Sequence, residues 1–176
     1  MEFETVALEN SEVQGMNLGN GQLIYDDYLR VKEAFQAKLA TYQALVAELK
    51  SRKSASITTQ EMRRVDALAE EIGLTEKQCR EKKDALLRIL ESLLLESRGM
   101  ERDVAYHAKE FRDEDKIEWV HSLVEESLRL RNDDELARAI EKAYQAKEFL
   151  ATLLSNANSG WIQQHQKKAE TWGREG

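Results

Sequence analysis

One cysteine, Cys79, and three histidines are the residues that could support nucleophilic catalysis in this chain. A cysteine or serine nucleophile needs an adjacent histidine base and a third group that orients the base. Cys79 belongs to a row of residues spaced by seven that is otherwise apolar, which predicts a buried and unreactive thiol. The segment 15–21 contains three glycines but lacks the lysine and the preceding strand of a phosphate-binding loop. We therefore expect no catalytic residues and a protein that is not an enzyme.

Glu118-Trp119-Val120-His121 has the Glu-x-x-His spacing, which places a carboxylate and an imidazole on one face of a helix. Ferritin-like di-iron bundles use this spacing, but they need two such motifs and further glutamates. This chain has one motif, and His107 with Asp103 one turn earlier is its only obvious supplement. One chance match is unremarkable in a chain with 33 acidic residues. We expect no metal ligands and no cofactor, with Glu118 in solvent and His121 beside the core.

Residues 65–83 resemble the helix-turn-helix of many bacterial regulators. The resemblance depends on the small Ala69, on Gly73 four residues later as the turn residue, and on Thr75 as the cap of the next helix. In that arrangement Cys79 would take a buried position of the second helix.

The resemblance implies that Lys77, Arg80 and Lys82 contact phosphates and bases. Two features oppose it. Lys82 stands where the family has an apolar residue, and the seven-residue spacing continues through Gly73 although a turn should shift its phase. A DNA-binding regulator with a helix-turn-helix at about residues 65–83 is therefore the alternative function, and nucleic acid is not the favoured partner.

Surfaces for protein partners are predicted in two places. The segment 86–95 is apolar on two sides, and the side that carries Leu87 and Leu94 must meet another helix of the chain, a second subunit or a client. Near the C-terminus, Trp161 and Trp172 fall on roughly one side of a helix. Tryptophan is enriched at interface anchors, although a tail that folds back onto the bundle would use the same residues. We take these four residues as the partner-binding candidates.

Long helices are the elements that must position these residues. From about residue 23 to 53 the residues Tyr28, Phe35, Tyr42 and Leu49 recur every seven positions, and a second apolar row is interrupted only by Lys38. A 3.5-residue repeat of this length is typical of helices that pack along one another. The segment 51–56 is then a small polar turn.

A second long helical pattern follows the turn. Thr58 with Glu61 three residues later fits a capping box, so a helix should begin at residue 59. Six residues then fall at intervals of seven, namely Val65, Ile72, Cys79, Leu86, Leu93 and Met100. Because Gly73 and Gly99 lie in this stretch, residues 59–112 form either one locally weakened helix or two or three coaxial pieces.

Acidic caps mark the later helices. Asp113 and Asp133 each precede a new apolar stripe, which predicts two shorter helices. The segment 155–160 is rich in Ser and Asn and ends in Gly, which predicts a loop before an amphipathic tail. The predicted organisation is a flexible N-terminal arm at 1–22, a helical hairpin and bundle at 23–156, and the tail at 157–176.

Composition agrees with this interpretation. The 176 residues include no proline and 34% charged residues, which favours long helices over loop-rich or sandwich folds. The net charge is −7, and no segment is strongly basic, so a general grip on polyanions is not favoured. A single cysteine excludes an internal disulfide. No stretch approaches the length of a membrane span and no secretory signal is evident, so we expect a cytoplasmic protein that does not enter membranes.

These observations predict an all-α protein with a long antiparallel, coiled-coil-like helical hairpin and a smaller helical bundle. Its expected function is that of a non-catalytic interaction protein, such as an adaptor, an assembly factor, a secretion-type chaperone or a structural subunit. It would bind protein partners through helix faces, and a homodimer through the heptad seam is one form of this. In general character the chain is similar to small helical proteins of flagellar and type III export.

Overall fold

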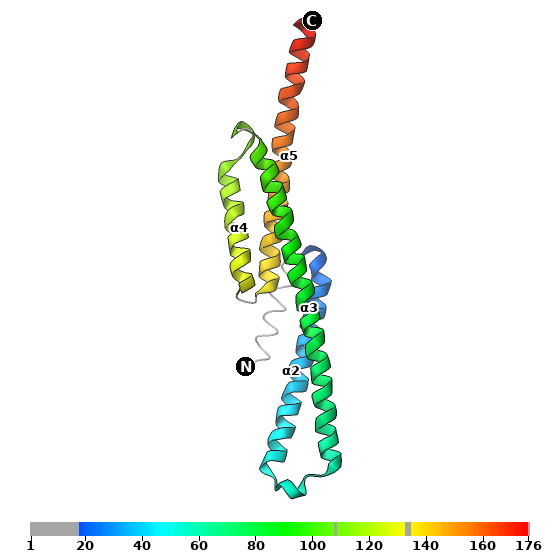
Figure 1. The fold of residues 1–176 in the computed structure, drawn as a ribbon. Coiled ribbons are helices and arrows are strands. Elements are labelled where there is room, and N and C mark those ends of the chain that lie inside the picture. The colour runs from blue at the N-terminus through cyan, green and yellow to red at the C-terminus, as the bar shows by residue number, and fades with distance from the viewer. Residues whose placement is uncertain (1–17, 108, 133–134, 176) are drawn as a thin grey trace. The chain divides into compact units, whose positions relative to one another are not determined.

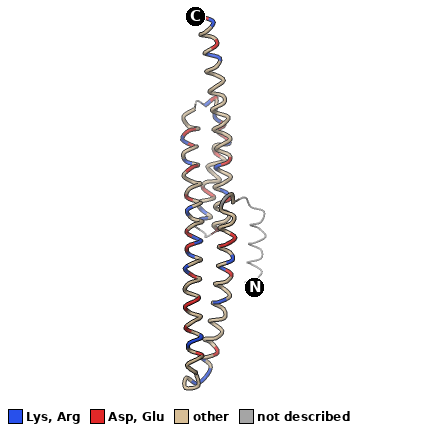
Figure 2. Tube along the Cα trace, turned by 90° about the vertical axis from the view of Figure 1, so that its right-hand side faces the viewer, with Lys and Arg blue, Asp and Glu red and all other residues tan. Residues whose placement is uncertain are grey.

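The computed structural model describes residues 18–107, 109–132 and 135–175, and all regular structure in these residues is helical (Figure 1). The α-helices are α2 (Gln22–Ser51), α3 (Thr59–Tyr106), α4 (Glu114–Asn132) and α5 (Leu136–Glu175). Short 3-10 turns lie at Gly19–Gly21 (η1), Ser54–Ser56 (η2) and Lys109–Phe111 (η3). Acidic and basic residues alternate along the helices (Figure 2). The all-α prediction is confirmed.

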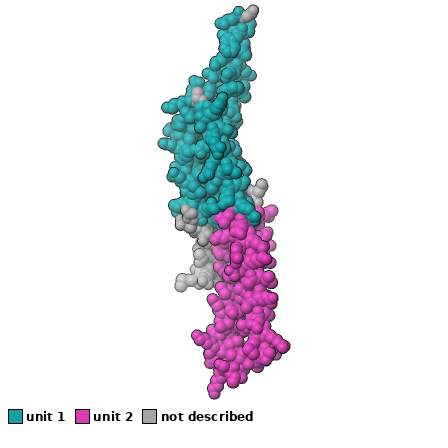
Figure 3. Space-filling view, in the orientation of Figure 1, with its two compact units in different colours: residues 1–19, 88–176 teal, residues 20–87 magenta. Residues whose placement is uncertain are grey.

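The chain forms two compact units, residues 20–87 and residues 1–19 with 88–176 (Figure 3). The first unit is a hairpin of α2 and the first part of α3, and we call it the hairpin. The second contains the rest of α3 with α4 and α5, and we call it the bundle. The predicted combination of a long antiparallel hairpin and a smaller bundle is therefore confirmed.

The hairpin has a narrow core because only two helices share it. Among the heptad residues of α2, Tyr28, Phe35, Tyr42 and Leu49 are all half-buried. Lys38, the exception in the α2 pattern, donates through Nζ to Thr75 Oγ1 of α3 at 3.3 Å. Thr75 is only 5% exposed and donates in turn to the Glu71 carbonyl at 2.9 Å. The interruption of the apolar row is thus one polar layer of the core, satisfied on both helices.

The connection between the two hairpin helices is fixed by side chains. Thr58 caps α3, because its Oγ1 accepts from the Glu61 backbone N–H at 3.1 Å, as the capping box predicts. The Glu61 carboxylate does not complete the box. It binds the Arg52 guanidinium of the α2 C-cap through two contacts of 2.8 and 3.3 Å. Arg52 also donates to the Ser56 carbonyl at 2.9 Å, so one side chain holds both ends of the turn.

The first part of α3 corrects one prediction. The helix runs from Thr59 to Tyr106 without interruption, so neither Gly73 nor Gly99 ends it. The predicted helix-turn-helix at 65–83 is therefore wrong, since these residues form one continuous helix. The physical reason is that Ile72, Thr75 and Cys79 stay in phase on the side that faces α2, and a turn at Gly73 would remove them from it.

The bundle core lies where α3, α4 and α5 meet, around six buried residues: Val104, Val120, Leu123, Ala146, Leu150 and Leu153. The α4 helix begins where the sequence predicts, since Asp113 Oδ1 accepts from the Lys116 backbone N–H at 3.3 Å. Ser127 of α4 is fully buried and donates to the Ala139 carbonyl of α5 at 2.8 Å. Asp133, the other predicted cap, lies outside the described residues.

The longest correction concerns residues 155–160, which form no loop and instead lie within α5. Ala157 is completely buried and continues the row of Leu150 and Leu153, so the apolar contact keeps the helix in place. Asn158 Oδ1 lies 2.7 Å from His107 Nε2, so its side chain bonds another element in place of its own backbone. Gly160 lies against the Phe111 ring.

The described part of the N-terminal arm is ordered on the bundle. Leu18 is only 2% exposed, and Gly19 has a positive φ of 56°. A Cβ at Gly19 would lie 3.0 Å from the Tyr144 ring, so both the backbone conformation and the close approach require glycine there. Residues 1–17 of the predicted arm lie outside the described residues.

Candidate functional site

The C-terminal segment of α5, residues 160–175, is the part of the bundle that no other described helix covers. Figure 1 shows α5 continuing past the connection between α3 and α4. Beyond the half-buried Gly160, every residue from 161 to 175 except Gln164 is exposed. The segment carries three large apolar side chains in water, Trp161, Ile162 and Trp172, with exposed fractions of 44%, 50% and 68%.

The apolar residues of this segment continue the stripe that faces the bundle core. At 100° per residue, Trp161 and Trp172 lie within about 60° of Leu150 around the helix axis. Leu150 is 1% exposed, whereas the two tryptophans lie beyond the ends of α3 and α4. The Trp161 ring is in contact with the His165 ring one turn later, with the centroids 4.3 Å apart. The face is therefore formed for packing but lacks a second helix among the described residues.

The other predicted partner residues lie in different environments. Leu94 is 8% exposed and belongs to the interior of the bundle, and Leu87 is half-buried. The structure thus favours the alternative in which α3 meets other helices of its own chain along this side. Leu95, which the sequence did not single out, is 66% exposed.

The predicted nucleic-acid contacts do not gather on one recognition surface. Arg80 pairs with Glu76 at 3.3 Å on the same helix, and Lys82 pairs with Asp27 of α2 at 3.6 Å. Lys77 is exposed. These residues decorate the outside and the edge of the hairpin, as ion pairs along solvated helices do.

The histidines bond to single partners. His121 Nε2 lies 2.8 Å from Glu101 Oε1 of α3, and Glu118 is exposed. His107 is 9% exposed and bonds Asn158 of α5, so Asp103 is not its partner; its Nδ1 has no hydrogen-bond partner among the described residues. Within the described ranges, no group of three or more His, Cys, Asp or Glu side chains could hold a metal ion.

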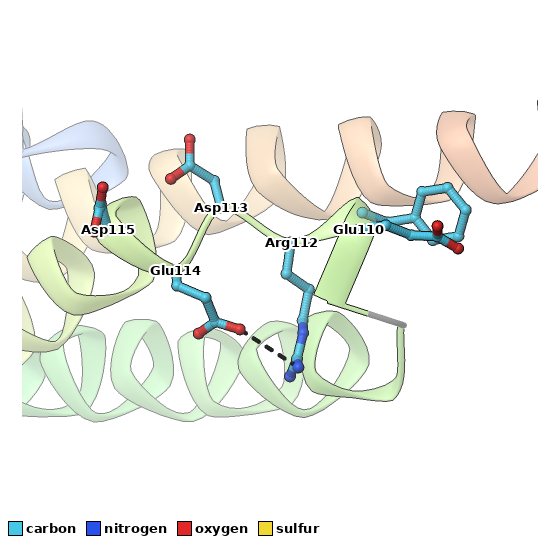
Figure 4. Close-up of a pocket in the computed structure, with 6 residues that line it drawn as sticks. Glu110, Arg112, Asp113, Glu114 and Asp115 are labelled. Atoms are coloured by element: carbon cyan, nitrogen blue, oxygen red, sulfur yellow. Dashed lines mark ion pairs between the residues drawn. The ribbon is translucent and has the colours of Figure 1, made fainter.

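A polar pocket lies at the connection between α3 and α4, formed by residues 110–115 (Figure 4). The Glu114 carboxylate is directed toward Arg112, with Oε1 3.4 Å from Nη2. Asp113 caps α4, and Asp115 stands in the first turn, where the helix dipole favours an acid. The start of α4 therefore accounts for these acids.

Cys79 lies half-buried in the hairpin seam. Burial is the main cause that raises the pKa of its thiol above the ordinary 9.0; the neighbouring Lys32 opposes the shift and Glu76 adds to it. A thiol with a raised pKa is a poor nucleophile at neutral pH. This agrees with the sequence-based interpretation of Cys79 as a core residue.

Comparison of the chain with protein-family models, curated proteins and solved structures finds no significant match. No helix of the described ranges combines the length and the apolar character needed to cross a bilayer.

Proposed function

We propose that this chain is a non-catalytic interaction protein of the cytoplasm, an adaptor, assembly factor or secretion-type chaperone that docks a protein partner on the C-terminal segment of α5. One observation carries the proposal. The apolar stripe of α5 continues through Trp161 and Trp172 after the bundle has ended, so a second helix could extend the same packing.

The chemistry of the segment supports a protein partner. Tryptophans at the centre of an interface are frequent hot spots, because each buries a large apolar area and has few rotatable bonds. The charges of the segment are balanced, with Lys167, Lys168 and Arg174 against Glu170 and Glu175. A nearly neutral face with aromatic anchors fits the groove or helix of another protein better than a polyanion.

The test is affinity capture from native cytoplasm with the full chain and with the double variant Trp161→Ala, Trp172→Ala. Hot-spot tryptophans contribute about 2 kcal/mol or more each. The double variant should therefore retain less than about a hundredth of the captured partner at limiting concentration. Gln163→Ala with Gln166→Ala is the matched control, since both residues are exposed in the same segment, and it should capture the partner as the wild type does.

Sedimentation velocity of the purified chain distinguishes a second copy from another protein as the partner. Equal capture by the wild type and by the tryptophan variant, with unchanged circular dichroism, would rule out the segment as the docking element.

A further inference from the structure

The end of the hairpin carries a second surface, which the function proposed above does not use. A groove of about 310 Å³ lies where α2 ends and α3 begins, lined by Leu49, Ser54, Ile57, Met62, Val65 and Asp66. Four of the six lining residues are apolar. Met62 is 49% exposed, and the other three apolar residues are half-buried. The floor of this hairpin-end groove is therefore apolar and open to solvent.

The groove is held open by the contacts of the turn. Arg52 bonds Glu61 and the Ser56 carbonyl, and Thr58 caps α3. These bonds join the end of α2, the turn and the start of α3, so the two walls are fixed before any ligand arrives. A preformed groove binds an extended segment more tightly because less ordering is needed on binding.

The rim of the groove is basic in an acidic protein. Residues 49–66 contain five Lys or Arg and two Asp or Glu, whereas the whole chain has a net charge of −7. Arg52 is paired with Glu61. Four exposed bases, Lys50, Lys53, Arg63 and Arg64, have no ion-pair partner within the part of the chain that the structure describes. Figure 2 shows basic residues on both helices next to this turn.

We propose that the hairpin-end groove binds an acidic peptide segment of a partner protein. Its apolar side chains would lie on Leu49, Ile57 and Met62, and its carboxylates would pair with the four rim bases. Charge-assisted bonds from arginine to carboxylates are the strongest of these contacts, because the guanidinium can bind both oxygens. The four charges are fewer than a nucleic-acid groove uses, and no aromatic ring lies among them on which a base could stack.

The binding test uses fluorescence anisotropy of a fluorescein-labelled synthetic peptide of repeated Glu-Leu-Glu-Phe units, titrated with the full chain. We expect saturable binding that weakens as salt is added, since rim charges are screened. The variant Arg63→Glu, Arg64→Glu should weaken binding by about tenfold or more. Lys77→Glu with Arg98→Glu is the matched control, because it makes the same charge change at exposed sites on the same helix outside the groove, and it should bind as the wild type does.

A second variant separates a groove from a merely basic surface. Met62→Lys adds a positive charge but removes an exposed apolar side chain from the floor, so the proposal predicts weaker binding of the peptide. If attraction between charges alone caused the binding, the same variant would bind more tightly, and the proposal would be overturned.

Two further outcomes decide the class of ligand. A peptide with Gln in place of every Glu should not bind, and vesicles of phosphatidylserine and phosphatidylcholine should bind less well than the acidic peptide. Binding of the vesicles without binding of the peptide would assign the surface to a membrane and overturn the proposal. The variant Trp161→Ala, Trp172→Ala should leave the peptide affinity unchanged, so this test can fail or succeed independently of the α5 surface.

Discussion

Substitution of Gly160 by alanine tests how α5 packs against the connection that precedes α4. An alanine inside a helix usually stabilises it relative to glycine by about 0.8–1 kcal/mol. At Gly160, however, the new Cβ would lie 2.6 Å from Phe111 Cδ1 and 3.1 Å from Cε1. Ordinary carbon contacts are about 3.5–4.0 Å, so the Phe111 ring must move by nearly 1 Å. Moving it also disturbs its edge contact with His107, whose ring centroid is 6.3 Å away.

Overpacking of this kind costs about 1–3 kcal/mol, which exceeds the gain in helix propensity. We expect Gly160→Ala to lower the free energy of unfolding by about 1 kcal/mol, the difference between the middle of that range and the propensity gain. Gly99→Ala is the matched control, because nothing lies within 4 Å of a Cβ there, and it should raise the free energy of unfolding by about 0.5–1 kcal/mol.

The assay is urea unfolding of the full chain followed by far-UV circular dichroism, with Phe111→Ala as a second background. Once Phe111 has lost its ring, Gly160→Ala should become stabilising by roughly the amount seen at Gly99, and the double-mutant cycle should show a coupling of about 1–3 kcal/mol. If Gly160→Ala stabilises the wild-type chain as much as Gly99→Ala does, Phe111 is not packed on Gly160 and the reasoning is refuted.

Three further outcomes are expected in the bundle. Ser127→Ala should cost about 1 kcal/mol of unfolding free energy in urea, because it removes a buried hydrogen bond to an α5 carbonyl; no loss would show that the bond contributes nothing. Asp113→Ala should cost about 0.5–2 kcal/mol through the lost cap on the Lys116 N–H, whereas Asp113→Asn should cost much less, and equal losses would contradict capping. The hydrogen bond from Glu96 raises the pKa of Lys147 above 10.5, so its stabilisation is present below that pH and lost as the pH rises through the raised value. Lys147→Met should therefore flatten the alkaline limb of the stability profile measured by urea unfolding, and an unchanged limb would argue against the pair.

The helix pattern could be predicted from the sequence because the information is local. Rows of apolar residues at intervals of seven, such as Tyr28 to Leu49 and Val65 to Met100, report which side of each helix is covered. The capping box at Thr58 fixed the start of α3 to the residue. Lys38 is more instructive, since the polar side chain that breaks its row is matched by Thr75, 37 positions later. Nothing in either segment alone pairs these two residues.

The prediction failed where residues of low helix propensity have distant partners. Asn158 and Gly160 indicate a loop when they are considered alone. In the folded chain Asn158 bonds His107, and Gly160 makes room for Phe111, both about 50 residues earlier. Ala157 between them is completely buried. A single sequence does not show that such residues serve tertiary contacts, so their propensity points to the wrong local structure.

The surfaces could be predicted only in part, for a related reason. Trp161 and Trp172 are conspicuous residue types at helical spacing, and both are exposed as a docking face requires. Leu94 has the same apolar character, yet α3 turns it into the bundle. The hairpin-end groove was missed because its turn is polar in sequence, and its floor forms only when Leu49 and Met62 approach from two helices.

The two halves of α5 differ in what holds them helical. From Leu136 to Ala157 nine residues are buried, five of them alanines whose small side chains let the neighbouring helices approach closely. From 161 onward no residue is buried, so the segment is helical only by extension from the bundle and by contacts within itself, such as Trp161 on His165. Extension avoids the cost of nucleation, but an uncovered helix of this length is of marginal stability in water. A partner that packs on Trp161 and Trp172 would therefore stabilise the helix as well as bind to it, and its affinity would include the free energy of that ordering.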